Sequence, residues 1–265
     1  MLLFVALFGV AHAQQVVWVD FDSETDTGAD PTDFIYSAPD RITVLGALSD
    51  KFSGLGVTFT DTMPTTGLFS KVTLNFGSGG SSGGVDFQNK KKSDSASVHA
   101  PALLDFVGES SPTPTEVLIA TVNVTAHEVG HLLGARHDDA FLDIGAGVAP
   151  GPFAGDFGPA YPGPTAATET YSEIMAANTG FTITKDVYVD PDLYFGPRSS
   201  AKILQGAAPP LDVDVDETDL MHDSVPTAQI LPLKTFEIPN NFPAGHPAEG
   251  AVLLVDMVIV EEATL

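Results

Sequence analysis

The chain has 265 residues, 43% of them hydrophobic, so it can bury a sizeable core and is not disordered throughout. Its 35 acidic side chains outnumber 11 Lys and Arg, giving a net charge of −24, which argues against nucleic-acid partners and anionic membranes because both require clustered cations. The chain has no cysteine, which excludes disulfides, thiol catalysis and cysteine-ligated metal.

The first 13 residues predict a signal peptide. They form an apolar stretch that ends in the small-x-small pattern Ala11-His12-Ala13. This stretch is too short to span a bilayer. We therefore expect export to a secreted or cell-envelope location, with no transmembrane segment in the mature chain.

The next part of the chain reads as a strand followed by a helix. Residues 16–21 alternate in hydrophobicity and predict the strand. The acidic stretch 20–33 could hold calcium, but its glycine is out of register with an EF-hand, so we favour a solvated turn. A helix is predicted over residues 39–52 from apolar side chains at helical spacing. These are Ile42, Leu45, Leu48 and Phe52.

Short strands and one loop are predicted between this helix and the next. Residues 57–60 and 70–76 have strand patterns. The glycine- and serine-rich stretch 77–84 predicts a flexible loop, and it is no phosphate cradle because no Gly-Lys-Ser/Thr follows. Residues 98–106 predict a further strand, at an edge of the sheet because Pro101 interrupts it.

A long helix is predicted over residues 114–133. Thr113, Pro114 and Glu116 occupy the N-cap, N1 and N3 positions of a capping box. The β-branched run 117–125 would also suit a strand. We favour the helix, because the capping signal agrees with the spacing of the residues that follow.

The helix leads into the string His-Glu-Val-Gly-His-Leu-Leu-Gly-Ala-Arg-His at residues 127–137. His127 and His131 lie one helical turn apart on one face, where two imidazoles can hold a zinc ion at about 2.0–2.1 Å per bond. Gly134 suits the reversal that would bring His137 to the same ion as a third ligand. Three protein ligands leave a position open, as in catalytic sites, and Glu128 is placed to act on a water there.

This extended motif resembles that of the metzincin zinc endopeptidases, and Asp138 after the third histidine resembles the reprolysin (adamalysin) branch. The resemblance implies an α+β catalytic domain over residues 14–206. Its upper part, to about residue 134, would be a mixed twisted sheet with two main helices above the cleft. Its lower part, residues 135–206, would be small and irregular. The three histidines would be the zinc ligands, Glu128 the general base and Gly134 the turn residue.

Met175 follows in the segment Tyr-Ser-Glu-Ile-Met-Ala-Ala, residues 171–177. A methionine alone would be core filler. After the extended motif it resembles the Met-turn, whose methionine forms a hydrophobic floor beneath the zinc ligands. Astacins and serralysins carry a metal-binding tyrosine two residues later, and this chain departs from them because Ala177 stands there.

The remaining segments are less regular. Residues 138–170 predict an irregular loop, and residues 199–205 a helix. Residues 207–265 predict a linker and the start of a β-rich segment, in which 251–260 has a strong strand pattern. That strand pairs either with the main domain or within a second β-rich domain, which we favour. Alternating acids could bind calcium, although a solvated linker is the preferred interpretation. These are Asp212, Asp214 and Asp216.

Together these features predict a secreted zinc endopeptidase. Glu128 would take a proton from water at the zinc and pass it to the leaving amine. By resemblance, the substrate is a peptide or protein extended along an edge strand above the zinc. The alternatives are a zinc-dependent extracellular binding or adhesion module without turnover, and a zinc hydrolase acting on another bond. Glu128 argues against the binding module, since binding needs no base.

Overall fold

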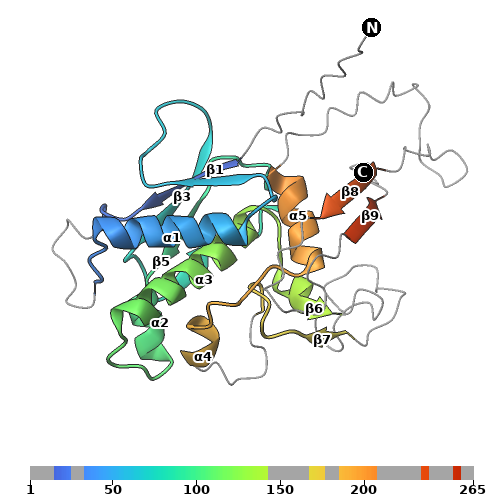
Figure 1. The fold of residues 1–265 in the computed structure, drawn as a ribbon. Helices are drawn as coiled ribbons and strands as arrows, with labels where there is room; N and C mark the ends of the chain where they lie inside the picture. The colour runs from blue at the N-terminus through green and yellow to red at the C-terminus, as the bar shows by residue number, and fades with distance from the viewer. Residues whose placement is uncertain are drawn as a thin grey trace, which may run out of the picture.

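The computed structural model describes residues 15–24, 33–142, 167–176, 185–207, 234–238 and 253–257. Within these ranges the chain has an α+β fold with a mixed five-stranded sheet and five α-helices (Figure 1). The predicted signal peptide, Ala177 and the aspartates 212–216 lie outside the described residues. No helix in the described ranges has both the length and the apolar character that crossing a bilayer requires.

The elements up to the long helix are β1 (Gln15–Asp20), α1 (Ala38–Lys51), β2 (Val57–Thr60), β3 (Phe69–Leu74), β4 (Gly80–Ser82), the 3-10 turn η2 (Phe87–Asn89), β5 (Ser95–Val98), α2 (Ala100–Phe106) and α3 (Pro114–Leu132). The elements after it are the 3-10 turn η3 (His137–Ala140), β6 (Phe141–Leu142), β7 (Thr168–Glu169), α4 (Lys185–Tyr188), α5 (Pro197–Ala207), β8 (Lys234–Ile238) and β9 (Leu253–Met257).

The sheet has the strand order β2-β1-β3-β5-β4. The first four strands are parallel, and β4 pairs antiparallel with β5 at one edge. Because side chains alternate between the two faces of a sheet, the register places one set of apolar residues on a single face. This set, which is almost completely buried, includes Val17, Val19, Val72, Leu74 and Val98.

Helices α1 and α3 pack against each other and against the sheet (Figure 1). The predicted helix over 39–52 is confirmed as α1, although Ile42, one of the four apolar side chains that predicted it, is 73% exposed. The buried stripe instead comprises Val44, Leu48 and Phe52, spaced four residues apart. Ile42 precedes Val44 by two residues, which places it on the opposite side of a helix with 3.6 residues per turn.

Helix α3 begins as the sequence predicts. The Thr113 hydroxyl accepts from the backbone N–H of Glu116, and the Glu116 carboxylate accepts from the N–H of Thr113 at 2.7 Å. The β-branched run that suited a strand is helical, because α3 is buried on nearly all sides and packing outweighs intrinsic propensity. Thr121 satisfies its hydroxyl inside the helix by donating to the Val117 carbonyl at 2.8 Å.

The prediction of a flexible loop over residues 77–84 is wrong at its centre, which forms strand β4. Gly80 is needed because the strand lies directly on α3 at that position. A Cβ on Gly80 would come within 2.4 Å of Glu128 Oε1 and 2.6 Å of Val124 Cγ1. Glycine usually weakens a strand, but at position 80 it is the residue that allows β4 to lie against α3.

The prediction of one interrupted edge strand over 98–106 is also wrong. Strand β5 ends at Val98 and lies inside the sheet, between β3 and β4. Pro101 stands in the first turn of helix α2, where the missing N–H has no helical partner to lose.

Most of the predicted irregular loop over 138–170 lies outside the described residues, and short elements stand at its two described ends. There η3 and β6 follow the motif, and β6 pairs antiparallel with β7. The predicted helix over 199–205 is confirmed within α5. The predicted strand over 251–260 is confirmed as β9, which pairs with β8 and not with the five-stranded sheet.

The capping box of α3 gives a first testable prediction. Thr113→Ala removes the acceptor for the Glu116 N–H and should lower the free energy of unfolding by about 1 kcal/mol, as measured by urea denaturation. Thr43→Ala in α1 is the control, because the exposed Thr43 hydroxyl only donates to the Pro39 carbonyl. An equal loss in the two variants would contradict the capping role.

Candidate metal centre

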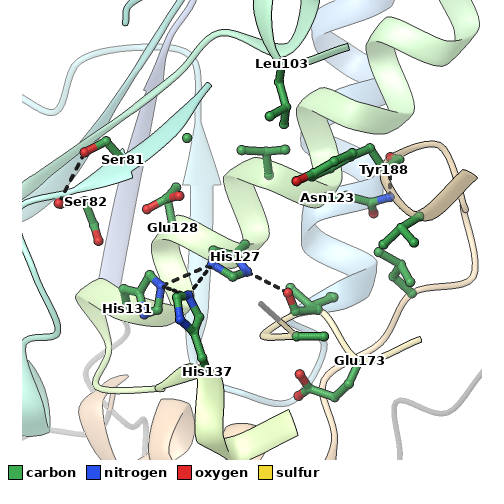
Figure 2. A pocket seen from close by; sticks show the side chains of 16 residues that line it. Ser81, Ser82, Leu103, Asn123, His127, Glu128, His131, His137, Glu173 and Tyr188 are labelled. Atoms are coloured by element: carbon green, nitrogen blue, oxygen red, sulfur yellow. Dashed lines mark hydrogen bonds between the residues drawn. The ribbon is translucent and has the colours of Figure 1, made fainter. Parts of the chain in front are cut away.

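Three histidine side chains meet at the end of α3. The Nε2 atoms of His127 and His131 lie 3.1 Å apart, and each lies within 3.2 Å of His137 Nε2 (Figure 2). His127 and His131 project from one face of α3, and His137 comes from η3 after the chain reverses. Among the described residues, these three form the one group of three or more His, Cys, Asp or Glu side chains that could hold a metal ion together.

Backbone carbonyls fix the tautomers of two of these histidines. His127 Nδ1 lies 2.7 Å from the Ile174 carbonyl oxygen, and His131 Nδ1 lies 2.9 Å from that of Ala135. A carbonyl can only accept a hydrogen bond, so each Nδ1 carries the proton and donates. In a neutral imidazole the Nε2 atom then carries a lone pair. The two lone pairs face each other without a proton between them, an arrangement that a cation would stabilise.

The spacing fits a tetrahedral metal site. Nitrogen ligands at about 2.0–2.1 Å from a tetrahedral ion lie about 3.3–3.4 Å from one another. The observed separations of 3.1–3.2 Å are close to this value. The residues present therefore fit one metal ion, and three protein ligands leave a fourth position for water or substrate.

The surroundings keep the imidazoles neutral. Burial, together with the neighbouring His131, lowers the pKa of His127 to about 3. Burial also lowers the pKa of His131 and that of His137. Metal binding requires the neutral imidazole, so protons do not compete for these ligands near pH 7.

Glu128 lies between the histidines and strand β4 (Figure 2). Burial raises the pKa of Glu128 to about 7, and hydrogen bonds from the Ser82 hydroxyl and backbone N–H offset part of that rise. A cation at the histidines would favour the charged form and lower this pKa. With a cation bound, the charged carboxylate is therefore the favoured form near neutral pH, and this is the form that can accept a proton.

Met175 lies fully buried against the helix that carries the histidines. A Cβ on Gly130 would come within 2.5 Å of Met175 Sδ, so the glycine of the His-Glu-Val-Gly-His string lets the methionine reach the helix backbone. The role of Met175 as a floor beneath the ligands stays a prediction.

The reversal after α3 depends on Gly134, as predicted. Its φ is +96°, and a Cβ there would lie 3.1 Å from the backbone nitrogen of Gln88. Asp139, which the sequence did not single out, is buried and anchors the turn that follows. It accepts from the Arg136 N–H at 2.7 Å and from Lys202 Nζ on α5 at 2.8 Å. Asp138 is half-buried, and its supporting role stays a prediction.

A cleft of about 410 Å³ opens beside the histidines. Strand β4 forms one side, and the segment around Ile174 together with α4 and Leu193 forms the other. The sequence pattern missed the contributions of β4 and of Glu173 in the cleft wall. The only local sign that Glu173 is buried is its position directly before two apolar residues, Ile174 and Met175.

Comparison with protein-family models gives no match, and no curated protein sequence matches the chain. The chemistry proposed for the metal centre is therefore derived from the residues of this chain alone.

The ligand assignment predicts loss of metal in His131→Ala. Removing a direct ligand should weaken zinc binding by more than the roughly 10–100-fold that is typical when an outer hydrogen-bond partner is lost. Elemental analysis after dialysis measures this loss. His99→Gln changes the one other histidine in the described ranges and should retain zinc. One tightly held zinc in His131→Ala would refute the assignment.

The contact between Gly130 and Met175 gives a matched pair of variants. In Gly46→Ala the new Cβ in helix α1 meets nothing within 4 Å, so the variant should be stabilised by about 0.5–1 kcal/mol. Gly130→Ala gains the same propensity but displaces Met175, and overpacking costs about 1–3 kcal/mol. Urea denaturation should therefore show Gly130→Ala to be the less stable variant, and equal stabilisation would contradict the close contact.

Proposed function

We propose that this chain is a zinc-dependent endopeptidase of the metzincin type, closest to the reprolysin branch. The observation that carries the proposal is the convergence of three histidine Nε2 atoms within 3.2 Å, with Glu128 beside them at an open cleft. A binding site needs no buried base at that position, whereas hydrolysis does.

The donor set favours zinc over other metals. Three neutral imidazoles suit zinc and other borderline ions, whereas calcium and magnesium prefer oxygen ligands. Bound zinc would act as a Lewis acid that polarises a carbonyl and makes water a better nucleophile. The three histidines would hold the ion, and the carbonyls of Ile174 and Ala135 would keep two of the rings in the orientation that binding requires.

Glu128 would move the proton in both halves of the reaction. Its carboxylate takes a proton from the attacking water, which adds to the peptide carbonyl carbon. The same residue then delivers that proton to the leaving nitrogen as the C–N bond breaks. Glu128 stands in the cleft lining beside the histidines, where one carboxylate can serve both transfers.

Strand β4 would align the substrate. It stands at the end of the five-stranded sheet and borders the cleft, with no further strand on its outer side among the described residues. An extended peptide can add to such an edge through backbone hydrogen bonds. The small residues Gly80, Ser81 and Ser82 would let the substrate backbone approach closely.

The decisive variant is Glu128→Gln, which keeps the shape of the side chain but cannot accept the proton. Peptide cleavage should fall by about 10⁴-fold, the upper end for a general acid–base group, because one residue serves both transfers. Zinc should remain bound, since the three histidines are unchanged. A casein or fluorogenic-peptide assay with and without chelator, combined with elemental analysis, measures both effects.

Glu109→Gln is the control, because Glu109 pairs with Lys185 outside the cleft lining. Cleavage by Glu128→Gln at a rate close to that of the unaltered protein would refute the mechanism. A zinc-loaded unaltered protein that cleaves no peptide would favour the binding or adhesion module instead.

A further inference from the structure

Glu173 is a buried carboxylate to which the catalytic proposal gives no role. It is 1% exposed and stands two residues before Met175, on the turn beside the histidines (Figure 2). Burial raises the pKa of Glu173 to about 7, and the Ser199 hydroxyl and the backbone N–H groups of Gly196 and Met175 offset part of that rise. Burying a carboxylate is unfavourable unless it is well partnered, so its partners show what it holds in place.

The two carboxylate oxygens bind two separate segments. Oε2 accepts from the Met175 N–H, and Oε1 accepts from the Gly196 N–H at 2.8 Å. The same two segments are joined by a backbone bond of 2.8 Å from the Ile174 N–H to the Tyr194 carbonyl. The turn that carries Met175 is therefore fastened to the chain leading into α5.

One peptide group connects Glu173 to the metal centre. The Met175 N–H and the Ile174 C=O belong to the same planar peptide unit, so they point in opposite directions. The N–H points to the Glu173 carboxylate, and the C=O accepts from His127 Nδ1 at 2.7 Å. A carboxylate, a peptide group and an imidazole thus form a continuous hydrogen-bonded chain that ends at His127 Nε2.

Such a chain has two physical consequences. It fixes the plane of the peptide group and therefore the direction of the carbonyl that His127 faces. It also polarises the peptide group, because hydrogen bonds in series strengthen one another, so the carbonyl becomes a better acceptor for the Nδ1 proton. A stronger acceptor at Nδ1 makes Nε2 a better metal ligand.

We infer that Glu173 is a positioning residue of the metal centre, which acts through the Ile174–Met175 peptide group to fix the tautomer and orientation of His127 and so raise the affinity for the metal. This role rests on the proposed zinc site but does not require peptidase activity.

Glu173→Gln tests the role with little change in shape. An amide has one acceptor atom and one donor group, so its NH₂ must face either the Met175 or the Gly196 N–H. Zinc affinity, measured by competition with a chelating dye, should fall by about 10–100-fold, as for other outer partners of ligands. In the metal-free variant, ¹⁵N NMR of the imidazoles should show His127 as a mixture of tautomers, whereas the unaltered protein holds the Nδ1–H form.

Asp94→Asn is the matched control, because Asp94 is a half-buried acid that binds Ser70 and lies outside the cleft lining. It should change neither zinc affinity nor the His127 tautomer. Glu173→Asp retains the carboxylate one methylene shorter, and it should recover part of the affinity and of the Nδ1–H form.

The outcomes separate the two proposals. A folded Glu173→Gln variant with unchanged zinc affinity and unchanged His127 tautomer would overturn the role of Glu173 alone. If Glu173→Gln does not fold, the same two measurements on Glu173→Asp decide. Failure of both variants to fold would make Glu173 a requirement of the fold and overturn the positioning role. Failure of the unaltered protein to bind zinc would refute the proposed function itself.

Discussion

Three imidazole nitrogens converge on one point, and at least two of them direct lone pairs there that repel each other, so the fold must hold the rings together before any ion arrives. Helix α3 supplies two of them by its own geometry, and the turn at Gly134 returns the third. The carbonyls of Ile174 and Ala135 fix two of the rings. The ion pair between Asp139 and Lys202 fastens the turn of the third ring to α5. Each restraint comes from a different segment, so the site is a property of the whole domain.

Close packing around α3 is the second condition of this arrangement. Gly80 lies against Glu128, Gly130 against Met175, and Gly206 against the last turn of α3. At all three positions a Cβ would meet atoms within about 2.5 Å, closer than side chains approach in folded proteins. Strand β4, the Met175 turn and α5 therefore enclose the end of the helix on different sides. The enclosure removes His127, His131 and Glu128 from much of their contact with water, and this desolvation shifts their pKa values.

Three buried carboxylates lie around the end of α3, and they differ in the groups that they bind. Glu128, Glu173 and Asp139 are all largely removed from water, and each has protein donors that offset the desolvation. Asp139 accepts from Lys202 and so joins its turn to α5. Glu173 accepts from the Gly196 N–H and so joins its turn to the chain that leads into α5. Glu128 accepts from Ser82 of β4 and faces the open cleft. That difference in setting suits Glu128 to proton transfer and the other two to holding the structure.

The sequence alone determined the features that arise from neighbouring residues. The capping box at Thr113 set the start of α3, the spacing of the histidines set their common face, and Gly134 set the reversal, because each depends on a few adjacent backbone groups. Only the tertiary structure decided that a glycine-rich stretch becomes β4 and that Glu173 is connected to His127 through the Ile174–Met175 peptide group. The close approach of Glu128 explains why a glycine stands at position 80. The Glu173 carboxylate binds the Gly196 N–H, which lies 23 residues further along the chain. Contacts between segments that are distant in sequence leave no periodic pattern within either segment, and they form only when the sheet, α3 and α5 pack together.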